Sequence, residues 1–117
     1  MQIDRVEIQV IGPETEHHTW SDDLPGQYQS NTLIRIYTDA GLEGIAGVWN
    51  ATSFGYDRYT AESLRHLVPI LIGRDPCERE SILHDLRPRV FPQPPGALAV
   101  IDIALWDIMG KIQDKPI

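Results

Sequence analysis

Cysteine is almost missing from this chain, which has one, Cys77, among its 117 residues. An internal disulfide is therefore excluded, and a single thiol is typical of a reducing compartment. Lysine and arginine together number 10, against 17 aspartates and glutamates. The net charge of −7, with basic residues scattered along the chain, argues against a nucleic-acid-binding surface. No apolar run is long enough for a membrane span or a signal peptide, so we expect a cytoplasmic protein without a membrane partner.

The first half of the chain predicts a small antiparallel sheet. Apolar and polar residues alternate in segments at about 3–11, 32–39 and 43–49, as they do in half-buried strands. The turn Asp39-Ala-Gly41 joins the last two segments, and Gly41 is suited to a positive φ. Between the first two segments, at residues 12–31, the alternation stops, and a loop of that length is usually functional or disordered.

Helical spacing replaces the alternation in the second half. We expect helices at about 58–72, 76–90 and 95–113. Gly73 is a natural C-terminal stop for the first helix, and Asp75 before Pro76 predicts the N-cap of the second. Strands followed by helices predict an α+β domain over residues 1–117, a three-stranded meander with three helices packed on one face. A chain of this length can build one core.

The last predicted helix is apolar around most of its circumference, and Trp106 is expected in the core. Asp102 lies among apolar residues, where a carboxylate is costly to bury without a partner. We expect it to bond local backbone or an arginine, and a polar contact across a domain interface is the alternative. Asp107 and Lys111 are four residues apart in the favourable acid-first order and predict a narrow polar edge. The main apolar stripe consists of Leu98, Ile101, Leu105, Ile108 and Ile112.

Three segments together resemble the N-terminal capping domain of the mandelate racemase and muconate lactonizing enzyme family, within the enolase superfamily. They are Thr-Asp-Ala-Gly-Leu-Glu-Gly-Ile-Ala-Gly at 38–47, Leu-Ile-Gly-Arg-Asp-Pro at 71–76, and Ala-Val-Ile-Asp-Ile-Ala-Leu-Trp-Asp-Ile-Met-Gly-Lys at 99–111. The resemblance implies a partner domain in the same protein, a modified TIM barrel. There three acidic residues hold Mg²⁺, and a lysine or histidine base removes the proton next to a substrate carboxylate. It also implies a small carboxylate substrate and a homo-oligomer.

The barrel does not fit in this chain, because it needs about 250 residues. The only lysines are Lys111 and Lys115, and there is no Lys-x-Lys pair. We therefore expect no catalytic residue and no metal ligand here, and a chain that is inactive by itself. It is interpreted as the first part of a longer enzyme.

The resemblance further implies two cap loops that close over the barrel mouth, at residues 12–31 and 50–57. Closure of such loops excludes water from the reacting groups. Trp49 is a weaker candidate for substrate contact, because it ends a strand. A metal site at His17 and His18 is disfavoured, since adjacent histidines on a loop lack ligand spacing. The main candidates for substrate contact are His17, Trp20, Tyr28, Asn50, Phe54 and Tyr56; Asp102, Trp106, Asp107 and Lys111 are candidates for the domain interface.

Several functions stay open. A hydroxy-acid or sugar-acid dehydratase or racemase is expected, and an enzyme similar to muconate cycloisomerase or dipeptide epimerase is an alternative. A different class is a free-standing, non-catalytic binding module with the cap fold. Such a module should have little exposed apolar surface, whereas a severed cap should expose the patch that met its barrel.

Overall fold

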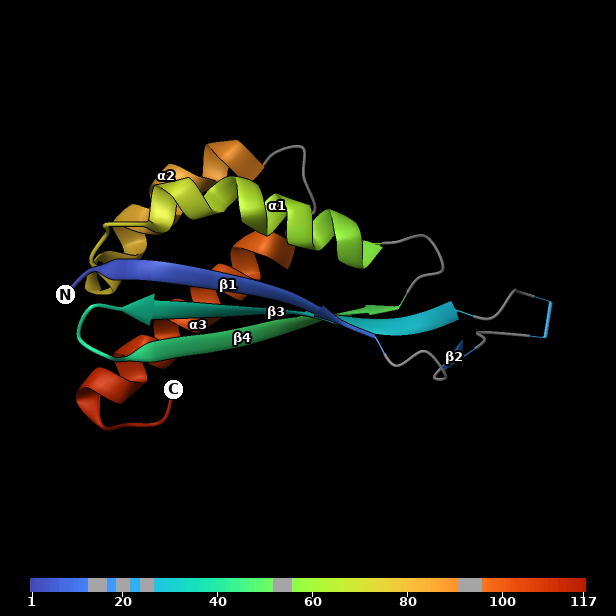
Figure 1. Cartoon of the computed structure of the whole chain (residues 1–117), viewed down its shortest axis with the longest axis horizontal. Helices are drawn as coiled ribbons and strands as arrows, with labels where there is room; N and C mark the ends of the chain where they lie inside the picture. The colour runs from blue at the N-terminus through green and yellow to red at the C-terminus, as the bar shows by residue number, and fades with distance from the viewer. Residues whose placement is uncertain (13–16, 19–21, 24–26, 52–55, 91–95) are drawn as a thin grey trace.

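The computed structural model describes residues 1–12, 17–18, 22–23, 27–51, 56–90 and 96–117. Its sheet contains β1 (Ile3–Ile11), β3 (Gln27–Thr38) and β4 (Glu43–Ala51), with β3 in the middle and antiparallel to both neighbours. A two-residue strand, β2 (His17–His18), pairs with the first residues of β3. The helices follow the strands in sequence and lie on one side of the sheet (Figure 1). This arrangement confirms the predicted α+β meander and its helical layer.

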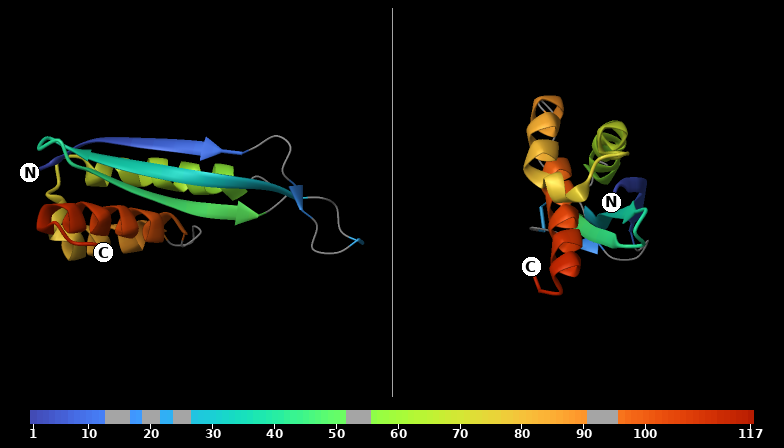
Figure 2. Two further views of the ribbon diagram at one scale, coloured as in Figure 1. Left: turned by 90° about the horizontal axis from the view of Figure 1, so that it is seen from below. Right: turned by 90° about the vertical axis from the view of Figure 1, so that its left-hand side faces the viewer.

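The helices form two layers over the sheet. They are α1 (Tyr56–Leu71), α2 (Arg79–Val90) and α3 (Gly96–Gln113), with a short 3-10 turn, η1 (Pro76–Glu78), before α2. The end-on view in Figure 2 shows α1 and α3 against the sheet, with α2 outside them. Among the described residues, α2 packs mainly on α1 and α3. The core therefore lies between α1, α3 and the covered face of the sheet.

Alternation along β3 decides which face is covered. Thr32, Ile34, Ile36 and Thr38 are buried, and the residues between them are half-buried. Ile34 lies opposite Ile8 of β1 and Ala46 of β4, so the apolar positions of three strands meet on one face. From the helices, this face is covered by Leu64, Leu67, Leu71, Ile101, Leu105 and Ile108, all of which are buried.

Two strands extend further than predicted at the end of the sheet where β3 begins and β4 ends. β3 begins at Gln27 rather than 32, because its first residues pair with β2 and with the end of β4. β4 continues to Ala51 rather than 49, and α1 begins at Tyr56 rather than 58. Parts of both predicted loops are therefore regular structure. Their polar composition does not show the apolar alternation from which strands were predicted, whereas the backbone pairing of β3 with β2 and β4 makes these strand residues regular structure.

Two glycines and one aspartate set the helix and turn boundaries as predicted. Gly41 has φ 79° in the turn before β4, and Gly73 has φ 83° after α1. These values belong to the left-handed region, which glycine adopts without steric cost. The Asp75 carboxylate accepts a 2.9 Å hydrogen bond from the N–H of Cys77 and caps η1. The predicted helix at 76–90 is accordingly split into η1 and α2.

Candidate functional site

The positions predicted to contact substrate gather at one end of the molecule. In Figure 1, β2, the start of β3, the end of β4 and the start of α1 all lie at the same end. His17 pairs directly with Tyr28, and Asn50 pairs with Ser30 two residues further along β3. Tyr56 is the first residue of α1. Four of the six candidates thus have backbones held by regular structure, while Trp20 and Phe54 lie outside the described residues.

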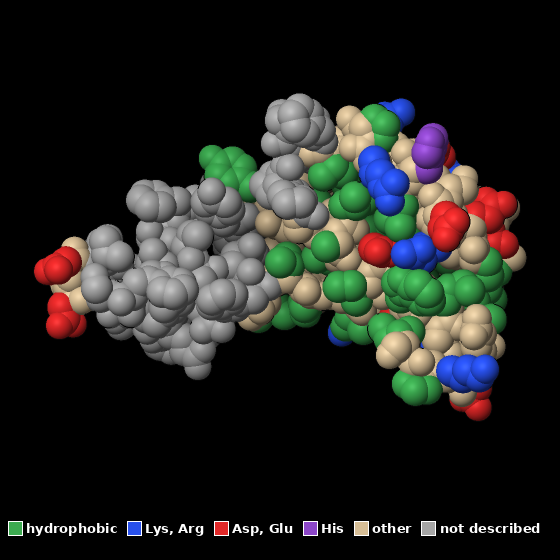
Figure 3. All heavy atoms as spheres, turned by 180° about the vertical axis from the view of Figure 1, so that it is seen from behind, with side chains coloured by type: hydrophobic (Ala, Val, Ile, Leu, Met, Phe, Trp, Pro, Cys, Tyr) green, Lys and Arg blue, Asp and Glu red, His purple; other side chains and the backbone are tan. Residues whose placement is uncertain are grey.

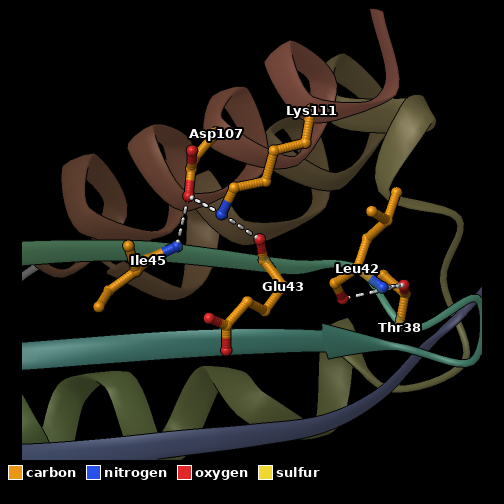
Figure 4. Close-up of polar contacts among 6 residues, drawn as sticks. All are labelled: Thr38, Leu42, Glu43, Ile45, Asp107 and Lys111. Carbon is orange, nitrogen blue, oxygen red and sulfur yellow. Dashed lines mark hydrogen bonds and ion pairs between the residues drawn. The ribbon is translucent and has the colours of Figure 1, made fainter. Parts of the chain in front are cut away.

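The opposite end of the sheet is joined to α3 by a polar cluster (Figure 4). One carboxylate oxygen of Asp107 accepts from the backbone N–H of Ile45 at 2.9 Å and from Lys111 Nζ at 2.9 Å. Lys111 Nζ also donates to the backbone carbonyl of Glu43 at 2.7 Å. The predicted pair of Asp107 and Lys111 is confirmed, and its contacts with β4 are an addition that the helical spacing did not indicate.

This cluster protects the edge of the sheet. Glu43 and Ile45 alternate with Gly44 along β4, and the backbone groups that Asp107 and Lys111 bind belong to these two residues. Unpaired backbone groups on an edge strand invite pairing with another chain. Side chains of α3 satisfy them instead. Partial burial alone would raise the pKa of Asp107, but the hydrogen bonds from Lys111 and Ile45 outweigh it and hold the pKa below its ordinary value.

Asp102 meets an arginine. Arg79 Nε, at the start of α2, lies 2.7 Å from Asp102 Oδ1, and both side chains are largely buried, with 22% and 31% of their surfaces exposed. The same guanidinium lies over the ring of Trp106, 4.6 Å from its centroid. Asp102 was expected to bond local backbone or an arginine, and the structure shows the arginine. Arg79 itself was not singled out, because nothing local links positions 23 residues apart.

Trp106 is not in the core of this chain, contrary to expectation. It is 46% exposed, and Ile103 on the same side of α3 is 47% exposed. Ile112, which the apolar stripe included, is also exposed. A helix that is apolar all round does not reveal which face meets its own sheet. Here the buried face is the one with Ile101, Leu105 and Ile108.

The described residues do not fit a magnesium site. No group of three or more histidine, cysteine, aspartate or glutamate side chains in the described part of the chain could hold a metal ion. The ion pairs between Arg79 and Asp102 and between Asp107 and Lys111 are structural contacts. No helix among the described segments is long and apolar enough to cross a membrane.

The architecture is that of an α+β capping domain. It consists of an antiparallel meander covered by helices on one face, and at one end of the sheet the start of β3 pairs with β2 and with the end of β4. The family model for "Mandelate racemase / muconate lactonizing enzyme, N-terminal domain" matches residues 17–117. The chain belongs to this family and is an N-terminal capping domain of the enolase superfamily.

Individual relatives are similar over a limited part of their length. The D-galactonate dehydratase family member RspA of Cellvibrio japonicus is 37% identical over an alignment of 89 residues, and the match covers 72% of this chain and 21% of that protein. A structure from Pseudovibrio sp., assigned provisionally to the mandelate racemase/muconate lactonizing enzymes, has 34% identity and a TM-score of 0.90. It matches 98% of this chain and 31% of that one. The L-talarate dehydratase of Polaromonas sp. JS666, solved with Mg and L-glucarate, shares the fold, with a TM-score of 0.81 and 19% identity over 96% of this chain and 32% of that one. This chain spans about a fifth of the length of the curated relatives it matches.

Proposed function

We propose that this chain is the substrate-capping part of a Mg²⁺-dependent dehydratase that acts on a hydroxy acid or sugar acid. The observation that carries the proposal is the match to the N-terminal domain of the family over residues 17–117, together with 37% identity to a D-galactonate dehydratase family member. Dehydration of a 2,3-dihydroxy acid removes the proton on C2, next to the carboxylate, and the hydroxyl group on C3, which together leave as water, while the hydroxyl group on C2 stays. The resulting enol becomes a 2-keto acid.

Mg²⁺ is assigned to the part of the longer relatives that this chain does not cover, since the described residues hold no suitable ligand cluster. The general base is assigned there as well. The Polaromonas dehydratase, which has the same fold in this region, was solved with Mg and a sugar acid. What this chain supplies in the proposal is enclosure and positioning of the substrate.

The enclosing part is the end of the sheet with residues 12–31 and 50–57. Backbone pairing of His17 with Tyr28, and of Asn50 with Ser30, builds this end from strands, which place side chains more reproducibly than free loops do. Closure there would exclude water and strengthen the electrostatic interactions with the substrate. The residues proposed to contact substrate are His17, Trp20, Tyr28, Asn50, Phe54 and Tyr56.

The exposed apolar face of α3 does not favour a free-standing binding module. That alternative predicted little exposed apolar surface, yet Ile103 and Trp106 are each almost half exposed. A cap that normally contacts a further domain would leave such a face uncovered when that domain is absent.

The test uses the full-length protein with Mg²⁺ and, separately, D-galactonate, L-talarate and L-glucarate. We expect 2-keto acid to form from at least one of them, measured as a semicarbazone by absorbance. Failure with all three and with a wider panel of sugar acids and hydroxy acids would contradict the dehydratase proposal. The lid is tested with His17→Gln and the matched variant His84→Gln, whose side chain on α2 is 84% exposed. We expect kcat/KM to fall severalfold for His17→Gln and to stay unchanged for His84→Gln. Equal kcat/KM values for the two variants would contradict a contact between His17 and the substrate.

A further inference from the structure

One face of α3 points away from the sheet and remains uncovered. Ile103, Trp106 and Met109 line a groove on this face together with Pro116 and Ile117. Ile103 and Trp106 are 47% and 46% exposed, which is unusual for large apolar side chains placed side by side. In Figure 3, which views the molecule from the side opposite to Figure 1, hydrophobic side chains gather over this region next to charged groups.

Arg79 lies at the rim of the same face with unused hydrogen-bond donors. Its Nε is taken by Asp102 at 2.7 Å, and its guanidinium plane lies over Trp106. A guanidinium has five N–H donors. Its two terminal nitrogens have no hydrogen-bond partner among the described residues, so four donors are available to another molecule or domain. Since the carboxylate and the indole hold the plane, these donors point in a fixed direction, which reduces the entropy lost on binding.

We propose that Ile103, Trp106, Met109 and Arg79 form a docking surface for the domain that follows this segment in the longer relatives. In this assignment, the terminal nitrogens of Arg79 donate to a backbone carbonyl or carboxylate oxygen of that domain. The inference rests on the part of the proposed function that makes this chain the cap of a longer enzyme. It adds which residues make the contact and which of them gives it polar specificity.

The path of the chain favours this occupant over a second copy. After α3 the backbone reverses: Asp114 has φ 52°, and the N–H of Lys115 donates to the carbonyl of Gly110 at 2.9 Å. After this reversal, Pro116 and Ile117 line the groove together with Trp106. In a protein that continues beyond Ile117, the following segment therefore starts at the uncovered face. In the curated relatives the matched part is only about a fifth of the length, so most of each relative lies outside this domain and is large enough to cover such a face.

The apolar half of the surface is tested in the full-length protein with Ile103→Asp and the control Ile72→Asp. Ile72 is 44% exposed, close to Ile103, but it lies outside the groove. Both variants and their parent also carry Trp20→Phe and Trp49→Phe, so that Trp106 is the only tryptophan within residues 1–117. In the parent background we expect the fluorescence of Trp106 to be shielded from quenching by acrylamide. Ile103→Asp should raise this quenching severalfold and should separate the thermal unfolding of the protein into two transitions. Ile72→Asp should do neither.

The polar half is tested with Arg79→Met combined with Asp102→Leu. This pair of substitutions removes the donors without leaving an unpaired charge inside the cap. We expect it to separate the two unfolding transitions as Ile103→Asp does, with the transition of the cap itself nearly unchanged; an unseparated transition would exclude Arg79 as the anchor.

Two results would overturn the docking surface. In one, Ile103→Asp behaves like Ile72→Asp. In the other, light scattering shows that Ile103→Asp lowers the mass of the assembly while the two domains still unfold together, which would assign the surface to a second copy. Dehydratase activity is measured separately on the unsubstituted protein, which keeps Trp20 and Trp49. If the unsubstituted protein dehydrates none of the acids while Ile103→Asp still separates the two unfolding transitions, the proposed reaction is contradicted and the docking surface stays in place.

Discussion

The carboxylate of Asp107 accepts a 2.9 Å hydrogen bond from the backbone N–H of Ile45, which joins the last helix to the edge of the sheet. The same oxygen binds Lys111, whose ammonium group reaches the carbonyl of Glu43. Two side chains one helical turn apart thus bind the edge strand at a donor and at an acceptor. This fixes both the position of α3 along β4 and its rotation.

Replacing Asp107 should destabilise the domain. Asp107→Ala leaves the N–H of Ile45 without its acceptor, and we expect a loss of about 1–3 kcal/mol in the free energy of unfolding. Asp107→Asn keeps an acceptor for Ile45 and should lose less. Urea unfolding measures both values, with Asp4→Ala on an exposed position of β1 as the control. Equal stability of Asp107→Ala and Asp4→Ala would show that the contact does not hold α3.

The pH dependence of stability should follow the same carboxylate. The folded pKa of Asp107 lies below its unfolded value of about 3.9, so the folded state favours the charged form. Its contribution is therefore fully present above about pH 4 and is lost as the pH falls through the lower folded pKa. We expect unfolding free energies measured between neutral and acidic pH to fall less steeply below about pH 4 in Asp107→Asn than in the parent protein. A parallel pair of curves would rule this contribution out.

The pair of Arg79 and Asp102 should show measurable coupling. Both groups are about a quarter exposed, so the cost of Asp102→Leu alone should lie between that of a surface pair and that of a fully buried pair, about 1–2 kcal/mol. The double variant with Arg79→Met should lose less than the sum of the two single variants, because it leaves no unpaired charge. Strict additivity in this cycle would mean that the pair contributes nothing to the stability of the cap.

At Gly44 the backbone of β4 comes close to α3. A Cβ atom there would overlap the carbonyl oxygen of Ala104 and lie 2.7 Å from Ile108 Cγ1. Gly44→Ala should therefore push α3 away from β4 and cost about 1–3 kcal/mol or more. Gly96→Ala is the control, since the nearest atom to its Cβ, on Val48, is at an ordinary 3.8 Å. Thermal unfolding compares them, and a Gly44 variant as stable as the Gly96 variant would contradict the close contact.

Local features of the sequence predicted local features of the structure. Alternation located the centres of the strands, and Gly41, Gly73 and Asp75 set the boundaries that their conformational preferences require. The spacing of Asp107 and Lys111 predicted their ion pair. Each of these depends on residues a few positions apart, where backbone geometry alone relates the side chains.

Long-range contacts were not predictable in the same way. The partner of Asp102 lies 23 residues away in another helix, and the contact of Asp107 with Ile45 joins residues 62 positions apart. The exposure of Trp106 depends on which face of an all-apolar helix the sheet covers. The early start of β3 was missed because its first residues are polar and are held by backbone pairing. The side chains proposed to contact substrate stay a prediction.

The most direct test of the central claim is exchange of the proton next to the carboxylate in the full-length protein. Sugar acids that the protein turns over are incubated in D₂O with Mg²⁺, and the signal of that proton is followed by NMR in the remaining substrate and in the product. A capping domain of a proton-abstracting enzyme predicts Mg²⁺-dependent loss of the α-proton, suppressed by a chelator and restored by added Mg²⁺. Turnover that leaves the α-proton in place, or that proceeds equally with the metal chelated, would contradict the account.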